Sequence, residues 1–165
     1  MMTGRAGLVA PLLHGYNRRE LGRVASWYTP DARIHPAGWD AAVDVPTWLA
    51  AFRMMLTSFP DLELIPEHVA TAKDLVILEA RLTGTNSGPF HLGDLDRLVL
   101  GTDAERLPPT GRAIDITGAV VFQTAGGLVA TERHYWKTVD SLLQLGLVES
   151  RQGGPNQQIH ATKSA

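Results

Sequence analysis

Four stretches in the second half of this chain alternate between apolar and polar residues, and a period of two is the pattern of a β-strand. We expect strands over residues 62–69, 75–83, 113–122 and 128–136. Gly126-Gly127 separates the last two and predicts a hairpin turn, because glycine adopts a positive φ without steric cost. The second half therefore predicts an antiparallel sheet of consecutive strands.

The first half carries helical patterns instead. Apolar residues over 12–27 recur roughly at helical spacing and indicate one or two helices. Asp44 and Pro46 are typical of a helix start, and apolar residues over 48–59 recur on one face. A short extended segment ends at His35, because the proline that follows disfavours helical backbone. Helices on one face of a curved antiparallel sheet predict the α+β class, with a pocket at the mouth of the resulting cone.

The length and hydrophobic content suit one domain. A chain of 165 residues with 44% hydrophobic residues can fill one core. We expect the domain over residues 12–148, after a lead over residues 1–11. The segment 149–165 has few apolar residues and is expected to be a disordered tail.

Charge and cysteine content exclude several partners and chemistries. The 15 Lys and Arg residues against 17 Asp and Glu residues leave a net charge of -2 without a basic stripe, so nucleic acid is not an expected partner. The absence of cysteine excludes disulfides and thiolate catalysis. The N-terminal apolar run is broken by Pro11 and is too short to span a membrane, so we interpret the chain as cytoplasmic, without a membrane partner.

Glu132, His134 and Trp136 alternate along the last expected strand, so they share one face of the sheet. An acid, a titratable base and a large aromatic ring would then line one cavity. Imidazole suits proton transfer at physiological pH, with Glu132 orienting it or accepting the proton. The alternative is a buried neutral histidine that is hydrogen-bonded to a neighbour, with Glu132 as a solvated charge.

Four segments resemble those of a known family: Phe59-Pro-Asp-Leu62, Thr83-Gly-Thr-Asn-Ser-Gly-Pro-Phe90, Pro108-Pro-Thr-Gly-Arg112 and Ser141-Leu-Leu-Gln-Leu-Gly146. Their order and context are similar to those of SnoaL-like polyketide cyclases, a branch of the nuclear transport factor 2-like superfamily. The resemblance covers roughly residues 12–148. It implies a cone-shaped barrel in which a curved antiparallel sheet wraps around N-terminal helices. The same fold also serves ketosteroid isomerases, epoxide hydrolases, cofactor-free hydroxylases and non-catalytic modules.

The resemblance also shows departures. It places His134 where the cyclases carry the aspartate that acts as general acid and base, and Val120 where an assisting histidine lies. Asn86 replaces the histidine of their Gly-Thr-His segment. His35, before a proline, resembles the position of the catalytic aspartate of ketosteroid isomerases, and it could line the pocket or lie on the surface. The segment 94–106 is longer than is usual in the family and is expected to be an exposed loop, which could contain a short helical turn and could act as a lid.

Further side chains could contact a substrate. The aromatic rings could stack on a polycyclic ligand or fill the core. Tyr16 could donate its hydroxyl to a substrate or pack in the core. The polar candidates could bind a ligand oxygen, face solvent or cap a turn. These candidates are Trp136, Trp48, Phe52, Tyr16, Asn86 and Arg81. His35, His134 and Glu132 lack the spacing of a metal site, so we expect no metal and no other cofactor.

The preferred hypothesis is a small-molecule enzyme in which His134 performs acid–base catalysis in an apolar pocket. Its reaction would be an aldol-type cyclisation or an isomerisation of a small hydrophobic or polycyclic ligand. One alternative is an epoxide hydrolase-type or hydroxylase-type enzyme acting on a polyketide or terpenoid. The other is a non-catalytic ligand-binding or dimerisation module. We also expect a homodimer or higher homo-oligomer, because the sheet leaves an apolar outer face.

Overall fold

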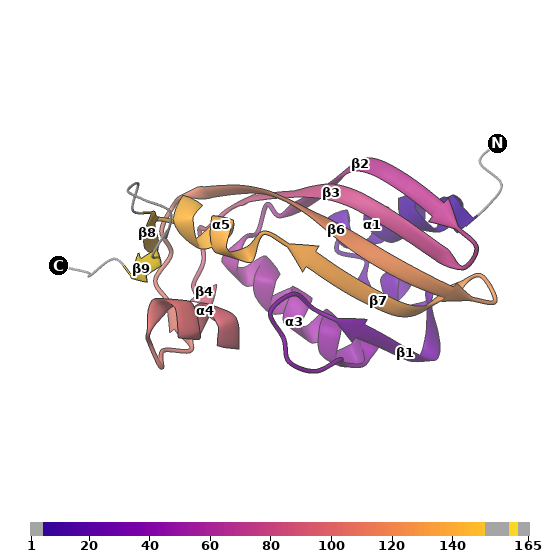
Figure 1. Cartoon of the computed structure of the whole chain (residues 1–165), viewed down its shortest axis with the longest axis horizontal. Coiled ribbons are helices and arrows are strands. Elements are labelled where there is room, and N and C mark those ends of the chain that lie inside the picture. Colours follow the sequence, from indigo (N-terminus) through magenta and orange to yellow (C-terminus); the bar gives the residue numbers. More distant parts are fainter. Residues whose placement is uncertain (1–4, 151–158, 162–165) are drawn as a thin grey trace.

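The computed structural model describes residues 5–150 and 159–161 (Figure 1). Its helical elements are η1 (Arg5–Leu8), α1 (Val9–Asn17), α2 (Leu21–Ala25), α3 (Val45–Ser58), α4 (Asp94–Leu100) and α5 (Thr138–Gln144). Its strands are β1 (Tyr28–His35), β2 (Glu63–Ala72), β3 (Leu75–Thr85), β4 (Phe90–His91), β5 (Arg106–Leu107), β6 (Ala113–Ala125), β7 (Leu128–Trp136), β8 (Val148–Ser150) and β9 (Ile159–Ala161).

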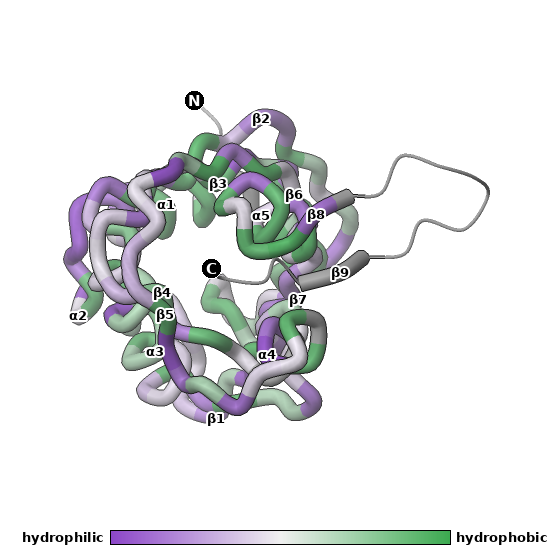
Figure 2. The backbone as a smooth tube through the Cα atoms, turned by 90° about the vertical axis from the view of Figure 1, so that its left-hand side faces the viewer, coloured by the Kyte–Doolittle hydropathy of each residue, from purple (hydrophilic) through white to green (hydrophobic). Residues whose placement is uncertain are grey.

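The main sheet has five strands in the order β1-β7-β6-β3-β2. Figure 2 shows it as an arc with α1, α2 and α3 on its concave side. β2, β3, β6 and β7 pair antiparallel, as their sequence pattern predicts, whereas β1 joins β7 in parallel. The α+β class with a curved sheet around helices is confirmed. The arc leaves β1 and β2 as edges, so the described strands do not close into a barrel.

Alternation along the strands builds the core between the sheet and the helices. Every second side chain of β3, from Val76 to Leu82, is buried, and the intervening ones face outward. α3 supplies the facing layer with Leu49 and Phe52. Its start is as predicted, because the Asp44 side chain accepts a hydrogen bond from the Thr47 backbone N–H at 2.9 Å.

The segment expected to be an exposed loop is more structured than its acidic composition suggests. It contains α4 and lies between the paired strands β4 and β5. Leu92, just before α4, is buried, and Leu100 at its end packs against the core. These apolar contacts hold the segment against the hydrophobic core.

Both ends of the chain also carry structure beyond the expected domain. Leu8 and Val9 are buried, so residues 5–11 extend the core rather than forming a separate lead. At the other end, β8 pairs antiparallel with β9. The remainder of the expected disordered tail, residues 151–158 and 162–165, lies outside the described residues, as do residues 1–4.

Candidate functional site

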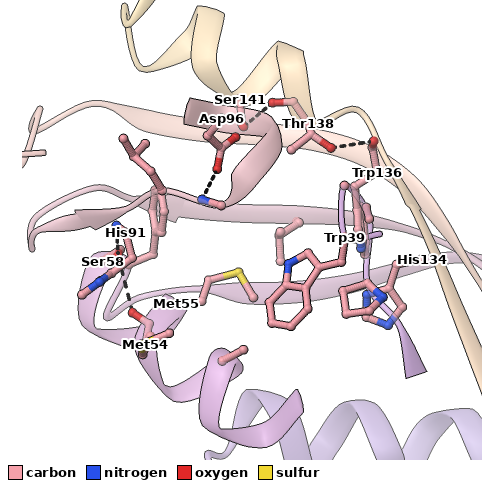
Figure 3. A pocket seen from close by; sticks show the side chains of 18 of the residues that line it. Trp39, Met54, Met55, Ser58, His91, Asp96, His134, Trp136, Thr138 and Ser141 are labelled. Atoms are coloured by element: carbon pink, nitrogen blue, oxygen red, sulfur yellow. Dashed lines mark hydrogen bonds between the residues drawn. The ribbon is translucent and has the colours of Figure 1, made fainter. Parts of the chain in front are cut away.

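A cavity of about 260 Å³ lies between the concave face of the sheet, α3 and the α4 segment. Figure 3 shows His134, Trp39 and Trp136 at one end of it and Ser58 and His91 at the other. Most of its wall is apolar, including Trp39, Trp48, Met55, Leu82, Ile116 and Trp136. A concave apolar site with few polar groups suits a small hydrophobic ligand.

The hydroxyl groups of the cavity wall donate to backbone carbonyls. Ser58 donates to the carbonyl of Pro89 at 2.7 Å, and Ser141 donates to that of Thr138 at 2.6 Å. Thr138 donates to the carbonyl of Trp136 at 3.2 Å. Their protons are therefore engaged within the fold and are not directed at a ligand.

Asp96 brings a carboxyl group from α4 to the cavity wall (Figure 3). Its Oδ2 accepts a hydrogen bond from the backbone N–H of Gly93 at 2.9 Å, which caps the helix. Burial raises the pKa of the Asp96 carboxyl, and the Gly93 hydrogen bond opposes that rise. The acidic segment thus contributes one side chain to the site.

His134 extends from β7 into the wall and is nearly buried, with 6% of its side chain exposed. Its Nε2 lies 2.6 Å from Oε1 of Glu132. The ring meets Trp48 edge to face, with centroids 4.6 Å apart. Its other nitrogen, Nδ1, makes no hydrogen bond with the residues that the structure describes. Nδ1 is therefore uncommitted, on a ring that lines the main cavity.

Glu132 is 3% exposed and sits at the end of a chain of hydrogen bonds. The Tyr28 hydroxyl donates to its Oε2, and the Tyr28 and Tyr16 hydroxyl oxygens are 3.0 Å apart. The indole N–H of Trp48 donates to the Tyr16 hydroxyl at 2.8 Å. A buried carboxylate is costly without such partners, and this one has a phenol on one oxygen and His134 on the other.

The two phenols predict a loss of stability at alkaline pH. Burial, and next the negative charge of Glu132, raise the pKa of Tyr16 and Tyr28 well above the ordinary value of 10.0. Unfolded chains ionise tyrosine near that value, so this stabilisation is present below about pH 10 and is lost as the pH rises further. Phenolate absorbance and circular dichroism, followed together, should show two of the chain's three tyrosines ionising only as the fold is lost. Ionisation of all three in the folded state would contradict the expectation.

A second, smaller cavity of about 50 Å³ lies behind His134 and shares Trp48, Met55 and Trp136 with the first. Its wall is apolar apart from Tyr16, Glu132 and His134, and it includes Phe52. The imidazole therefore lines both cavities.

Trp136 can occupy the cavity wall because Gly118 lies opposite it on β6. A methyl group at residue 118 would lie 2.3 Å from Cε3 of the indole, which is too close for any contact. Gly118→Ala is therefore expected to displace the indole and to lower the free energy of unfolding by about 1–3 kcal/mol, measured by urea denaturation.

Gly22→Ala is the matched control for that substitution. A methyl group at Gly22 would meet nothing within 4 Å, and the residue lies in α2. Alanine favours the helix over glycine by up to about 1 kcal/mol, so this variant should be at least as stable as the parent. Equal stability of the two variants would show that Trp136 adjusts to the added methyl group.

The structure brings six of the nine candidates from the sequence together. They are His134, Glu132, Trp136, Trp48, Phe52 and Tyr16. His35 stands apart: it is exposed and lines neither cavity, because Ile34 takes the inward position of β1 and alternation turns His35 outward. Arg81 also faces outward, and its guanidinium binds the Asp115 carboxylate through Nε at 3.0 Å and a terminal nitrogen at 2.6 Å.

Asn86 is completely buried but lines neither cavity. Its Nδ2 donates to the carbonyls of Ser58 at 3.2 Å and Gly88 at 2.9 Å. Its Oδ1 accepts from the Thr110 backbone N–H at 2.8 Å and from the Thr110 hydroxyl at 3.1 Å. The side chain ties the end of α3, the turn at Gly88 and the segment before β6 together.

Tyr28 is a site residue that the sequence reasoning did not select. A signal was available, because Tyr28 shares the even-numbered positions of Ala32 and Ile34, which are buried on β1. Asp96 gave no such signal, since acidic residues surround it in the sequence.

Residues 5–150 and 159–161 show neither a cluster of metal-ligating side chains nor a helix that could span a membrane. No group of three or more His, Asp or Glu side chains in this part of the chain gathers as metal ligands would. None of the helices described there has the length and apolar character to cross a membrane.

A sequence profile of the SnoaL-like polyketide cyclases matches residues 8–145. The chain belongs to this family. Among curated proteins, no sequence matches it. The family assignment therefore rests on the profile match over residues 8–145.

Solved structures share the fold of this SnoaL-like protein. AclR, a proposed hydroxylase from Streptomyces galilaeus, superposes with a TM-score of 0.70 at 20% identity, covering 88% of this chain and 98% of its own. IdmH, a proposed polyketide cyclase from Streptomyces antibioticus, gives 0.69 at 24% identity, covering 86% and 98%. A proposed SnoaL-like polyketide cyclase from Jannaschia sp. CCS1 gives 0.70 at 25% identity, covering 86% and 90%.

Proposed function

We propose that this SnoaL-like protein is a cofactor-independent enzyme that removes a proton from a carbon next to a carbonyl group, leading to ring closure or isomerisation of its substrate. The observation that carries the proposal is the His134–Glu132 pair in the wall of an apolar cavity, at 2.6 Å, with Nδ1 of His134 uncommitted. Proton transfer by a positioned side chain needs this combination of reach and orientation.

The pair accounts for both halves of the proton transfer. With the proton of His134 on Nε2, facing Glu132, the lone pair of Nδ1 is free to take a proton from the substrate. The imidazolium that forms is then stabilised by the buried carboxylate, as acid–histidine pairs do in other enzymes. The histidine thereby takes the role that the resemblance assigns to an aspartate in the cyclases.

The developing enolate needs neutral hydrogen-bond donors. The indole groups of Trp39 and Trp136 both line the cavity, and neither N–H donates to a side chain or carbonyl among the described residues. These two groups are the donors we assign to the enolate oxygen. Their rings, with Trp48, also suit stacking on a planar polyketide-type substrate.

Hydrolase-type or hydroxylase-type chemistry is the second candidate. The likeness to AclR, a proposed hydroxylase, favours it at the level of the fold. In that case Nδ1 of His134 would take a proton from water instead of carbon. A non-catalytic module is less well supported, because the cavity is open and not filled by side chains.

Exchange of substrate hydrogen with solvent deuterium tests the proposal. A panel of aromatic β-keto esters, as simplified polyketides, would be incubated with the protein in deuterated buffer. We expect deuterium at the carbon between the two carbonyl groups, detected by mass spectrometry at a rate above that with His134→Gln. Exchange no faster than with this variant, for a ligand that demonstrably binds, would exclude proton abstraction from carbon. Hydrolysis or oxygen incorporation would favour the second candidate.

We also propose that the protein is cytoplasmic and forms a homodimer through the outer face of its sheet. The outer face of the sheet exposes Ile77 by 41% and Tyr135 by 58%, on β3 and β7. Val121 of β6 lies beside Ile77 on that face. Light scattering at micromolar concentration is expected to give twice the chain mass of 17.9 kDa.

Charge introduced on that face should separate the copies. Ile77→Lys is expected to give the monomer mass, because a buried unpaired charge opposes association. Leu98→Lys is the control, since Leu98 is exposed on α4, away from the sheet. A monomer mass for the parent chain would contradict the homodimer.

A further inference from the structure

The hydrogen bonds that end at Glu132 have a forced direction. The indole N–H of Trp48 can only donate, so the Tyr16 oxygen accepts it at 2.8 Å. A carboxylate can only accept, so the single hydroxyl proton of Tyr28 points at Oε2 of Glu132. The proton of Tyr16 must then point at the Tyr28 oxygen, 3.0 Å away. All three donors are aligned toward one carboxylate.

The direction of these hydrogen bonds determines which oxygen of Glu132 is left to accept a hydrogen bond from His134. Tyr28 engages Oε2, and Oε1 faces Nε2 of His134 at 2.6 Å. Because an ionised carboxylate needs a donor at that distance, Nε2 must carry the proton of the neutral ring. Nδ1 is then the unprotonated nitrogen, on a ring that lines the main cavity.

Burial keeps the arrangement in place. Tyr16, Tyr28 and Glu132 are all buried, so water does not replace the phenols as donors. Both hydroxyl protons stay bound at physiological pH, since the ordinary phenol pKa of 10.0 is already well above it and burial raises it further. Phe52 packs edge to face against Tyr16, with ring centroids 4.8 Å apart, which limits the movement of that phenol.

We propose that Tyr28 is a positioning residue: by holding Glu132 through Oε2, it fixes the proton of His134 on Nε2 and keeps Nδ1 free as the base. The inference deepens the proposed function and rests on it for its kinetic consequence. Its structural part, the identity of the protonated nitrogen, does not depend on any substrate. Tyr16 and Trp48 act one and two steps further away, by orienting the Tyr28 hydroxyl.

A merely structural role would leave the protonated nitrogen unchanged, so nuclear magnetic resonance of the histidine ring nitrogens separates the two roles. The full chain would be labelled with ¹⁵N-histidine, and the signals of His134 assigned by their absence in His134→Gln. In the parent protein we expect neutral His134 to show a protonated Nε2 and an unprotonated Nδ1. In Tyr28→Phe we expect a mixture of the two tautomers, because Glu132 is free to turn.

Tyr135→Phe is the matched control, since it removes the same hydroxyl group from an exposed residue of β7. It should give the parent spectrum. Tyr16→Phe should shift the tautomers less than Tyr28→Phe does, because the Tyr28–Glu132 hydrogen bond remains. If Tyr28→Phe does not fold, a tautomer shift in Tyr16→Phe supports the proposal and a parent-like spectrum overturns it.

Turnover gives the second readout. Tyr28→Phe is expected to lower kcat about 10–100-fold with KM changed less than about twofold, the range for outer partners that orient a histidine. A protonated Nδ1 in the parent, or a Tyr28→Phe variant with parent-like tautomer and kcat, overturns the proposal. Failure of the proposed function would give a different result. The protein would catalyse no deuterium exchange, but Tyr28→Phe would still change the tautomer of His134.

Discussion

Replacing His134 by alanine is expected to lower turnover by about 10²–10⁴-fold, the usual contribution of general acid–base catalysis. KM should stay nearly unchanged, because the apolar wall around Trp48, Met55 and Trp136 remains to bind the substrate. Among the described side chains of the main cavity, the imidazole is the one that is hydrogen-bonded to the buried Glu132, so its loss removes the paired base. Steady-state kinetics on a substrate identified by deuterium exchange would measure both constants.

His68→Ala is the control for the loss of an imidazole. His68 lies on β2 and its Nδ1 is 3.0 Å from Glu79 on the exposed surface, so its removal should leave both constants within about twofold of the parent. A His134→Ala variant with unchanged kcat would exclude His134 as the base. A variant with raised KM and unchanged kcat would assign it to substrate binding alone.

Asn86→Ala is expected to lower the free energy of unfolding by about 2–5 kcal/mol, because buried polar groups left without partners cost about 1–3 kcal/mol each. The substitution removes both donors to the carbonyls of Ser58 and Gly88 and the acceptor for the Thr110 N–H. The site is also tight: a methyl group at Gly88 would lie 1.8 Å from the Thr57 carbonyl oxygen. Urea denaturation followed by circular dichroism measures the loss.

Asn17→Ala gives the comparison for Asn86→Ala. Asn17 exchanges two hydrogen bonds of 2.9 Å with the backbone of Leu64, but it is only half-buried, so water can replace its amide. Its loss should cost about 1 kcal/mol. If Asn86→Ala lost activity at parent stability, Asn86 would be a substrate contact rather than an anchor of the fold.

The strands and the main site residues could be predicted because both depend on local alternation. The period of two places Glu132, His134 and Trp136 on one face of β7 wherever that strand lies. The structure agrees, and their side chains line the cavities. The same reasoning was available for His35, but the resemblance to ketosteroid isomerases favoured a residue that alternation turns outward.

The partners of Glu132 could not be predicted in the same way. Tyr28 lies 104 residues before Glu132, and they meet because β1 joins the sheet in parallel beside β7, with an irregular register between Tyr28 and Arg33. Sequence alternation does not specify which strands become neighbours, nor where a register shifts. The packing of the α4 segment against the core was missed for a related reason, since it comes from contacts with distant parts of the chain.

The small cavity behind His134 has a stereochemical consequence. At about 50 Å³ it is too small for a polyketide-type ligand, so such a ligand can meet the imidazole only from the main cavity. A base that acts from one wall must return the proton to the face of the substrate from which it was taken. An isomerisation in this site would therefore be suprafacial, and part of the migrating hydrogen would be the substrate's own rather than the solvent's.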